Sequence, residues 1–305
     1  MRYLFGPVPS RRLGYSLGVD IIPHKVCTLD CVYCQLGPTT LRTMERKPYV
    51  EAYPVLAELD EILAKKVQID CITFSGSGEP TLNTCLGEII DGIKSRCSIP
   101  VTVLTNGTLL HLPEVRAGLM QADIVCPSFD AATPSAFMGI NRPHSGLSIQ
   151  TMTEGLTAFR RECPGRIFLE VMLAQGINDS PQELAALAAA VRGFDVDRIQ
   201  INTVIRPAAQ QGVLAVSAET LKLACGLFGP RAEIIGGFLK DRLLHEQENI
   251  GDNIVKLVAR HPSTPADICT ALGLPTELVD GYLKLLLQQG RVSIMVHGGS
   301  TFYKA

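Results

Sequence analysis

The sequence predicts an α/β fold, with a partial parallel (β/α)6 barrel followed by a small winged-helix-like module. Three observations predict it. Strand-like runs rich in branched residues alternate with helical patterns over most of the chain, and the alternation stops after Gly251. The 305 residues are few for a closed eight-fold barrel with a further module, since that barrel alone takes about 250 residues. We therefore expect a barrel core over residues 1–249 and the module over residues 250–305.

Six strands and five helices are expected in the core. In the first helical stretch, Val55, Leu59 and Ile62 belong to one apolar face at a spacing of 3.6 residues. Strands that alternate with helices form a parallel sheet with right-handed crossovers. The expected strands are 16–22, 71–75, 101–105, 123–128, 166–173 and 198–205, and the helices are 51–66, 83–96, 148–162, 181–191 and 218–228.

The C-terminal pattern consists of helices at 253–259, 265–272 and 275–289, followed by strands at 291–296 and 300–303. The last helix would be the recognition helix of a winged-helix module, but it carries Glu277 and Asp280 against Lys284 alone. Because DNA affinity needs a basic face, we expect no DNA binding. We expect the module to pack on the barrel or to grip a peptide or protein partner.

Composition excludes several classes of protein. The net charge is −2 without a long run of one sign, which argues against a protein built to coat nucleic acid. No apolar stretch approaches the roughly 18 residues of a membrane span. Gly6, Pro7 and Pro9 interrupt the N-terminal segment too early for a signal peptide. We therefore expect a soluble, cytoplasmic protein that does not enter membranes.

Cys27, Cys31 and Cys34 form a C-x3-C-x2-C cluster directly after the first expected strand. Three interpretations are open for it. A zinc site would need a fourth ligand, which His24 is placed to supply. A ferredoxin-type electron carrier would need four cysteines. The third interpretation is a 4Fe–4S cluster that leaves one iron free for a small molecule.

Ligands of parallel α/β folds bind at the carboxyl ends of the strands, where the distinctive polar residues of this chain fall. Gly76 and Gly78 remove side chains where a backbone must approach a ligand. Glu170, inside the fifth strand, needs a partner in the barrel, so it is either a site residue or part of a structural ion pair. The others are Ser77, Glu79, Thr105, Asn106, Ser128, Asp130, Asn202 and Arg206.

Several of these motifs resemble the radical S-adenosylmethionine (SAM) superfamily over about residues 15–210. The cysteine cluster matches its C-x3-C-x-aromatic-C loop, with Tyr33 as the aromatic residue. The stretch from Ser75 to Pro80 matches its Gly-Gly-Glu-Pro motif, except that a serine, Ser77, stands between the glycines. The resemblance implies a partial barrel of radical SAM type.

The resemblance also implies a cofactor site. The three cysteines would hold three irons of a 4Fe–4S cluster, and the fourth iron would chelate the amino and carboxylate groups of SAM. Tyr33 belongs to this cofactor loop, and the segment from Gly76 to Glu79 would contact the methionyl amino group. Thr105, Asn106, Ser128 and Asp130 would serve the methionyl carboxylate, the ribose or the substrate. Glu170 and Asn202 would contact ribose and adenine, with Val204 against the adenine ring.

Within the superfamily the chain looks most like poorly characterised Fe–S oxidoreductases that open with Gly-Pro-Val-Pro-Ser-Arg-Arg-Leu-Gly, here residues 6–14. Wyosine-type tRNA enzymes and molybdopterin cyclases are more distant relatives. The cyclases carry a second cysteine triad near the C-terminus, which this sequence lacks, so we expect no second cluster. We expect Arg11, Arg12, Arg142 and Arg206 to bind an anionic group of the substrate, because the arginine fork suits carboxylate or phosphate.

The resemblance implies reductive cleavage of SAM to a 5′-deoxyadenosyl radical, with an electron from a donor such as ferredoxin or flavodoxin. The radical would abstract hydrogen from a peptide, protein, RNA or metabolite. Two alternatives are an activase that places a glycyl radical on a partner protein, and a non-catalytic redox sensor in which the cluster controls a winged-helix reader.

Overall fold

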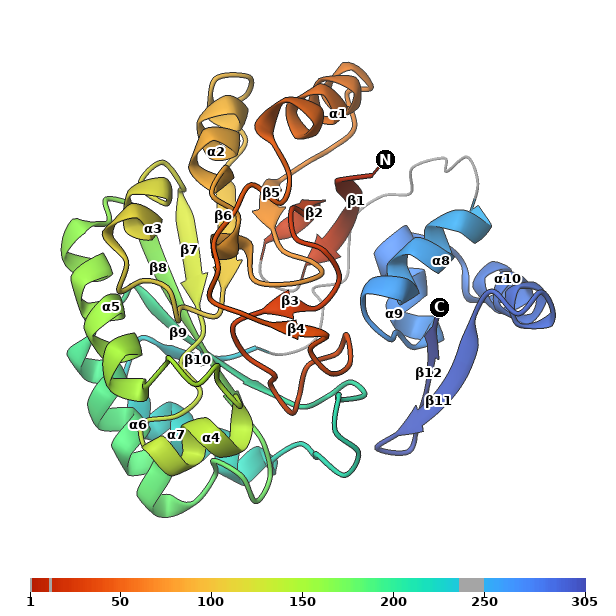
Figure 1. Cartoon of the computed structure of the whole chain (residues 1–305). Helices are drawn as coiled ribbons and strands as arrows, with labels where there is room; N and C mark the ends of the chain where they lie inside the picture. Colours follow the sequence, from red (N-terminus) through yellow and green to blue (C-terminus); the bar gives the residue numbers. More distant parts are fainter. Residues whose placement is uncertain (1, 11–12, 236–249) are drawn as a thin grey trace.

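The computed structural model describes residues 2–10, 13–235 and 250–305 (Figure 1). Its core is one curved eight-stranded sheet in the order β1-β2-β5-β6-β7-β8-β9-β10. All neighbours pair in parallel except β1 and β2, which are antiparallel. The predicted partial parallel barrel is therefore confirmed. The strands are β1 (Leu4–Ser10), β2 (Gly14–Val19), β5 (Cys71–Phe74), β6 (Val101–Thr105), β7 (Ile124–Pro127), β8 (Arg166–Leu173), β9 (Arg198–Thr203) and β10 (Ala232–Ile234).

The sheet has one more strand at each edge than the sequence predicts. Proline cannot donate to a ladder and is confined to edge strands, and β1 contains Pro7 and Pro9. It tolerates them because it is an edge strand, and its pairing with β2 shifts register between Phe5 and Val8. The other edge strand, β10, has only three residues, too few to show a period.

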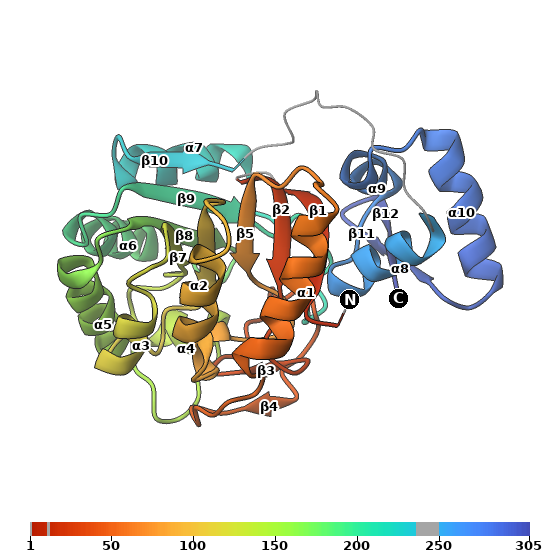
Figure 2. The ribbon, with the colours of Figure 1, turned by 90° about the horizontal axis from the view of Figure 1, so that it is seen from above.

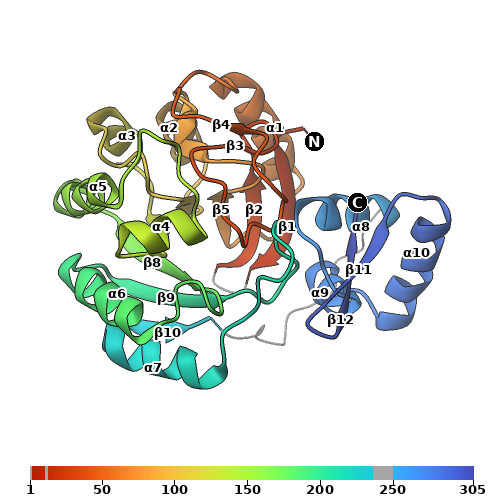
Figure 3. The ribbon, with the colours of Figure 1, turned by 60° about the horizontal axis from the view of Figure 1, so that its bottom comes forward.

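Helices cover the outer side of the curved sheet (Figure 3). Serine side chains cap several of them: Ser148 accepts from Thr151 N at the start of α5, and Ser180 accepts from Glu183 N at the start of α6. The core helices are α1 (Ala52–Ala64), α2 (Leu86–Lys94), α3 (Pro113–Gly118), α4 (Pro134–Ile140), α5 (Ile149–Glu162), α6 (Pro181–Gly193) and α7 (Ala218–Phe228), with one 3-10 turn at Pro80–Leu82.

The helix predicted at 83–96 begins at Leu86 instead. Asn83 is fully buried, and its Nδ2 donates to Ile21 O at 3.1 Å and to Val50 O at 2.9 Å. Its Oδ1 accepts from Cys85 N at 2.9 Å. These bonds tie Asn83 to other loops, so the residue joins the 3-10 turn to α2 without being part of the helix.

The C-terminal module, residues 250–305, consists of α8 (Ile250–Arg260), α9 (Pro265–Leu272), α10 (Thr276–Gln288) and the hairpin of β11 (Ser293–His297) and β12 (Ser300–Lys304). It has an apolar cluster of its own, which includes Ile254, Ile268 and Leu283. The division of the chain between residues 249 and 250 remains a prediction.

The module lies beside the edge strand β1 (Figures 1 and 2). Val8 of β1 packs against the apolar cluster of the module, and the guanidinium carbon of Arg260 lies 3.4 Å from the centroid of the Phe5 ring. We call this contact between β1 and the module the seam. Among the described residues no helix has the length and apolar composition needed to cross a membrane.

Candidate functional site

The three cysteines lie in a loop that begins at the short strand β3 (Val26–Cys27). All three are free thiols with half-buried side chains. Backbone bonds fix the loop: Asp30 N donates to Asn141 O at 3.0 Å, and Val32 N donates to Ile140 O at 2.9 Å. The end of α4, far along the sequence, therefore holds the cysteine loop in place.

Each cysteine sulfur accepts one hydrogen bond from a different side chain. Lys25 Nζ donates to Cys34 Sγ at 3.0 Å. Asn106 Nδ2 donates to Cys27 Sγ, and Asn141 Nδ2 donates to Cys31 Sγ, both at 3.4 Å. Donors of this kind stabilise sulfur in its anionic form, which is the form that binds metal.

Without a bound metal, burial of these cysteines favours the neutral thiol over the thiolate. It raises the pKa of Cys27 to about 11 and the pKa of Cys31 above its ordinary value, with the Glu79 carboxylate adding to the first and the Asp130 carboxylate to the second. A bound metal deprotonates such thiols outright. Three sulfurs with a hydrogen-bonded outer shell fit a sulfur-ligated iron cluster. His24, the fourth ligand of the zinc interpretation, is exposed.

The glycine-rich segment lies directly against the cysteine loop. A Cβ on Gly78 would lie 2.1 Å from Val26 O, and Glu79 N donates to that oxygen at 3.1 Å. Lys25 N in turn donates to Ser77 O at 2.6 Å. Only a residue without a side chain fits at position 78, so the glycine there serves a close approach of two backbones.

Asp20, just after β2, accommodates the inserted serine. Ser77 Oγ donates to Asp20 Oδ2 at 2.5 Å, and Ser77 N donates to Oδ1 at 3.1 Å. Gly76 has a φ of +140°, and a Cβ there would lie 2.5 Å from Asp20 Cγ. The departure from the Gly-Gly-Glu-Pro pattern is therefore matched by a carboxylate that holds the extra residue.

The carboxylate of Glu79 is buried and accepts four hydrogen bonds, three at Oε1 and one at Oε2. Thr81 donates to it through N at 3.1 Å and through Oγ1 at 2.6 Å. Thr105 Oγ1 and Asn106 N donate to it at 2.6 and 2.7 Å. Burial raises the pKa of Glu79, while these donors oppose the shift. The side chain thus joins the glycine-rich segment to the end of β6.

The buried carboxylate of Asp130 is a second group that connects several segments around the cysteine loop. It accepts from Tyr33 Oη at 2.5 Å, from Asn141 Nδ2 at 2.7 Å and from Met172 N at 2.9 Å. Burial raises the pKa of Asp130 to about 6, although the three donors lower it. Asn141 therefore contacts Asp130 and Cys31 at once.

Glu170 and Asn202 form a pair on β8 and β9, with Asn202 Nδ2 donating to Glu170 Oε1 at 3.1 Å. Ser128 forms an isolated β-bridge with Glu170, which places the end of β7 next to this pair. Val204 is buried just beyond the end of β9. These residues extend the site from the cysteine loop toward the later strands.

Two of the four arginines predicted to bind substrate, Arg142 and Arg206, belong to the part of the chain that the structure describes. Arg11 and Arg12 lie outside the described residues. Arg142 has a φ of +47° and donates to Gln210 Oε1, while its carbonyl oxygen accepts from Arg42 Nη1 at 3.0 Å. Arg206 faces the C-terminal module, with Nη2 at 3.9 Å from Asp267 Oδ2.

Three site residues were not predicted from the sequence: Lys25, Asp20 and Asn141. Lys25 stands two residues before the first cysteine, and Asn141 is the neighbour of Arg142, so both lie beside predicted site residues. Their roles depend on contacts across the fold, since Asn141 and Cys31 are 110 positions apart.

Comparisons with known proteins agree with this geometry. The family model described as the radical SAM superfamily matches residues 21–188. A UPF0026 protein of Helicobacter pylori strain 26695 is 32% identical over 309 residues, covering 99% of this chain and 97% of its own length. A protein of Brachyspira hyodysenteriae named GTPase Obg is 36% identical over 303 residues, covering 98% of this chain. The chain spans only 45% of the length of that second relative.

Among solved structures, a radical SAM methyltransferase from Sphaerobacter thermophilus has a TM-score of 0.57 and 16% identity, covering 72% of this chain and 65% of its own. This likeness concerns the fold. The GTPase name of the Brachyspira relative belongs to a chain more than twice as long, and the present sequence contains no G-x4-G-K-[ST] phosphate-binding motif.

Proposed function

Because this chain belongs to the radical SAM superfamily of enzymes, which use a 4Fe–4S cluster and SAM, we propose that it cleaves SAM reductively and abstracts hydrogen from a substrate. The observation that carries the proposal is the set of three cysteine sulfurs, each with its own hydrogen-bond donor, packed against a glycine-rich backbone. When bound, the cluster supplies the electron that breaks the sulfonium of SAM and yields the 5′-deoxyadenosyl radical. Such enzymes need a reductant, and we propose ferredoxin or flavodoxin.

In this proposal Cys27, Cys31 and Cys34 hold the cluster. In the same proposal the segment from Gly76 to Glu79 receives the methionyl amino group. Four donors of the protein already hold the Glu79 carboxylate, so its main role is to position the segment. Thr105 and Asn106 hold Glu79 from the end of β6, and Asn106 also donates to Cys27 Sγ.

The remaining site residues are assigned to the nucleoside and the substrate side. Glu170, held by Asn202, offers a carboxylate to the ribose hydroxyls, and Val204 offers an apolar surface to the adenine ring. Asp130 orients Tyr33 and Asn141 behind the cysteine loop, and Ser128 lies next to Glu170.

We assign an anionic group of the substrate to Arg142, whose backbone oxygen accepts from Asp30 N in the cysteine loop at 3.2 Å. Arg206 lies between the core and the module, so its effect on substrate binding depends on the docked module. The substrate is a peptide, protein, RNA or metabolite. For a peptide or protein, the exposed Leu278, Ile294 and Val296 of the module offer apolar contacts.

Anaerobic purification and reconstitution test the proposal. We expect iron and sulfide in the ratio of one 4Fe–4S cluster per chain, and 5′-deoxyadenosine after addition of dithionite and SAM. Stoichiometric zinc in place of iron and sulfide would contradict it. A cluster that forms but never cleaves SAM would favour the redox sensor, whereas transfer of a glycyl radical to a partner protein would identify an activase.

A further inference from the structure

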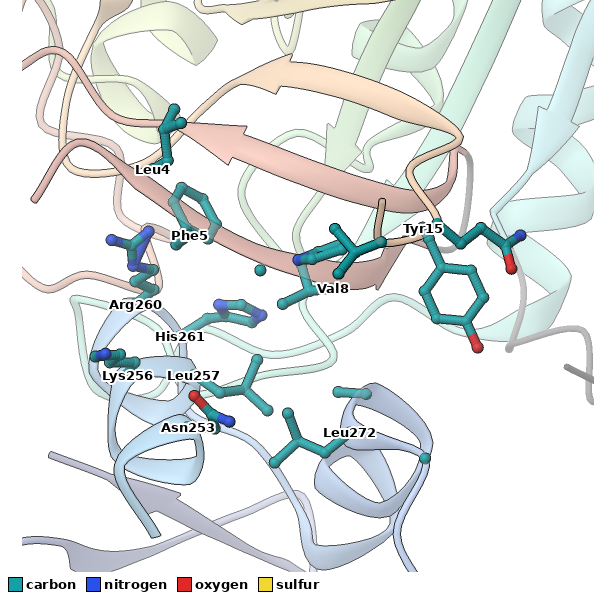
Figure 4. A pocket seen from close by; sticks show the side chains of 16 residues that line it. Leu4, Phe5, Val8, Tyr15, Asn253, Lys256, Leu257, Arg260, His261 and Leu272 are labelled. Atoms are coloured by element: carbon teal, nitrogen blue, oxygen red, sulfur yellow. The ribbon is translucent and has the colours of Figure 1, made fainter. Parts of the chain in front are cut away.

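A cavity of about 270 Å³ lies in the seam (Figure 4). Phe5 and Val8 of β1 form one wall, and Leu257 and Leu272 of the module form the other. Lys256, Arg260 and His261 supply the basic groups, and the described lining contains no Asp or Glu. The walls of the cavity are thus mostly apolar, and basic side chains line one side of it.

Arg260 is a half-buried cation in the lining of this cavity. Its Nη1 is buried without a hydrogen-bond partner, and it is the only such side-chain nitrogen or oxygen among the described residues. Its guanidinium covers the Phe5 ring, which lies on Gly18 so closely that a Cβ there would be 2.0 Å from Phe5 Cζ. The Phe5 ring therefore covers one face of the guanidinium. It cannot accept the hydrogen bonds that the N–H groups of Arg260 direct along the guanidinium plane.

No acidic side chain compensates this cation at contact distance among the described residues. The carboxylate that acts on it electrostatically is Asp20, and that carboxylate already accepts from Ser77 N and Oγ. Removing a guanidinium from water without a carboxylate in contact with it is unfavourable. An anion in the cavity would offset that desolvation.

We propose that this cavity binds a singly charged carboxylate with a short, branched aliphatic body. The planar fork of Arg260 matches a carboxylate. A single charge suits the apolar walls better than a phosphate dianion, since desolvation opposes each further charge. The volume lies below the roughly 300–1,000 Å³ of drug-sized ligand sites, so the ligand is small.

Both walls must be in place for the ligand to bind, because one belongs to β1 and the other to the module. A ligand that binds only the docked arrangement stabilises it. The carboxylate would therefore hold the module against the core, and so keep Asp267 near Arg206. This inference does not depend on the cluster or on SAM cleavage.

Calorimetric titration of the full chain with 4-methylpentanoate tests the proposal. We expect saturable binding of one molecule per chain, with 4-methylpentanamide and acetate at least about tenfold weaker, because the first lacks the charge and the second the apolar body. The peptide Gly-Gly-Leu and its C-terminal amide form a second arm. Tighter binding of the peptide acid would identify a peptide C-terminus as the source of the carboxylate, and tighter binding of 4-methylpentanoate a free acid.

Two variants and one control locate the site. Arg260→Met should lose at least about tenfold in affinity, whereas Lys284→Met, which removes an exposed charge on α10, should bind as the wild type does. Ala271→Phe, which fills the cavity and leaves Arg260 in place, should also abolish binding. Without ligand, Arg260→Met should melt no lower than the wild type, since it removes an uncompensated charge.

The opposite results would overturn the proposal. These are a wild type that binds none of the carboxylates, an Arg260→Met protein that binds as well as the wild type, or an unliganded Arg260→Met protein that melts several degrees lower. The last result would assign Arg260 to holding the Phe5 ring.

Discussion

Buried polar groups around the cysteine site have hydrogen-bond partners within the protein, whereas one buried polar group in the seam has none. Around the cysteines, the carboxylates of Glu79 and Asp130 are buried, and each accepts several hydrogen bonds from the protein itself. In the seam, Arg260 Nη1 is buried without a partner. A satisfied network fixes the positions of its members, whereas an unsatisfied group needs an explanation of its own. We propose that the first region positions a cofactor and that the second receives an anion.

Apolar side chains reach solvent in both units, but they are denser in the small module. The core buries most of its apolar residues in one large cluster and exposes others, such as Tyr53 and Met138, while the much shorter module exposes Leu278, Leu285, Ile294 and Val296. The exposed face of α10 also carries Glu277 and Asp280. A face of this composition suits a protein better than DNA. Four substitutions, from the largest expected effect to the smallest, test whether the core network is the positioning device described above.

Replacing one cysteine should have the largest effect. Cys31→Ala removes one of the three proposed sulfur ligands, and we expect loss of the cluster and no detectable 5′-deoxyadenosine. Cys97→Ala is the matched control, because Cys97 is a half-buried thiol in the same core that bonds only to Ile93 O at 3.7 Å. Iron and sulfide analysis with product chromatography provides the measurement. Equal loss in both variants would mean that the thiols act through packing alone.

Removing the carboxylate of Glu79 should destabilise the core. Glu79→Ala leaves buried donors of Thr81, Thr105 and Asn106 without an acceptor, and we expect a loss of roughly 2–4 kcal/mol in the free energy of unfolding. The exposed Glu88 of α2 supplies the control, Glu88→Ala, with a change within about 0.5 kcal/mol. Urea unfolding measures both. Similar values for the two variants would show that Glu79 does not brace the segment.

Adding one methyl group at Gly78 should cost less but act on the same contact. Gly78→Ala forces the backbone of the glycine segment away from Val26 O, and we expect roughly 1–3 kcal/mol of destabilisation with weaker binding of SAM. Gly193→Ala, at the end of α6, has no atom within 4 Å of the added Cβ and serves as control. Equilibrium binding of SAM to the reconstituted proteins measures the effect. If Gly78→Ala bound SAM as tightly as the wild type does, the glycine segment would not belong to the SAM site.

The sequence predicted the strands that carry the site because their apolar runs are long and regular, as in β6 and β8, whose bounds agree with the predicted 101–105 and 166–173. It did not predict β1, because Pro7 and Pro9 mask an edge strand. The cysteine and glycine motifs were readable as local spacing. The occupied carboxylate of Glu79 was not, because its donors come from β6 and from the turn after β5.

Lys25 gives the smallest and most specific test of the network. Its ammonium group donates to Cys34 Sγ at 3.0 Å, so it places a positive charge beside one sulfur ligand and favours the more negative, reduced state. Lys25→Met should therefore lower the midpoint potential by roughly 60 mV, a factor of ten in a one-electron equilibrium. Lys47→Met is the control, because Lys47 Nζ lies 5.0 Å from the centroid of the Tyr49 ring. Potentiometric titration followed by electron paramagnetic resonance measures the potential without relying on turnover. The result that would contradict this is a potential within about 10 mV of the wild type with the cluster fully loaded. The Lys25–Cys34 bond would then only position the loop, and the donors Asn106 and Asn141 would set the midpoint potential.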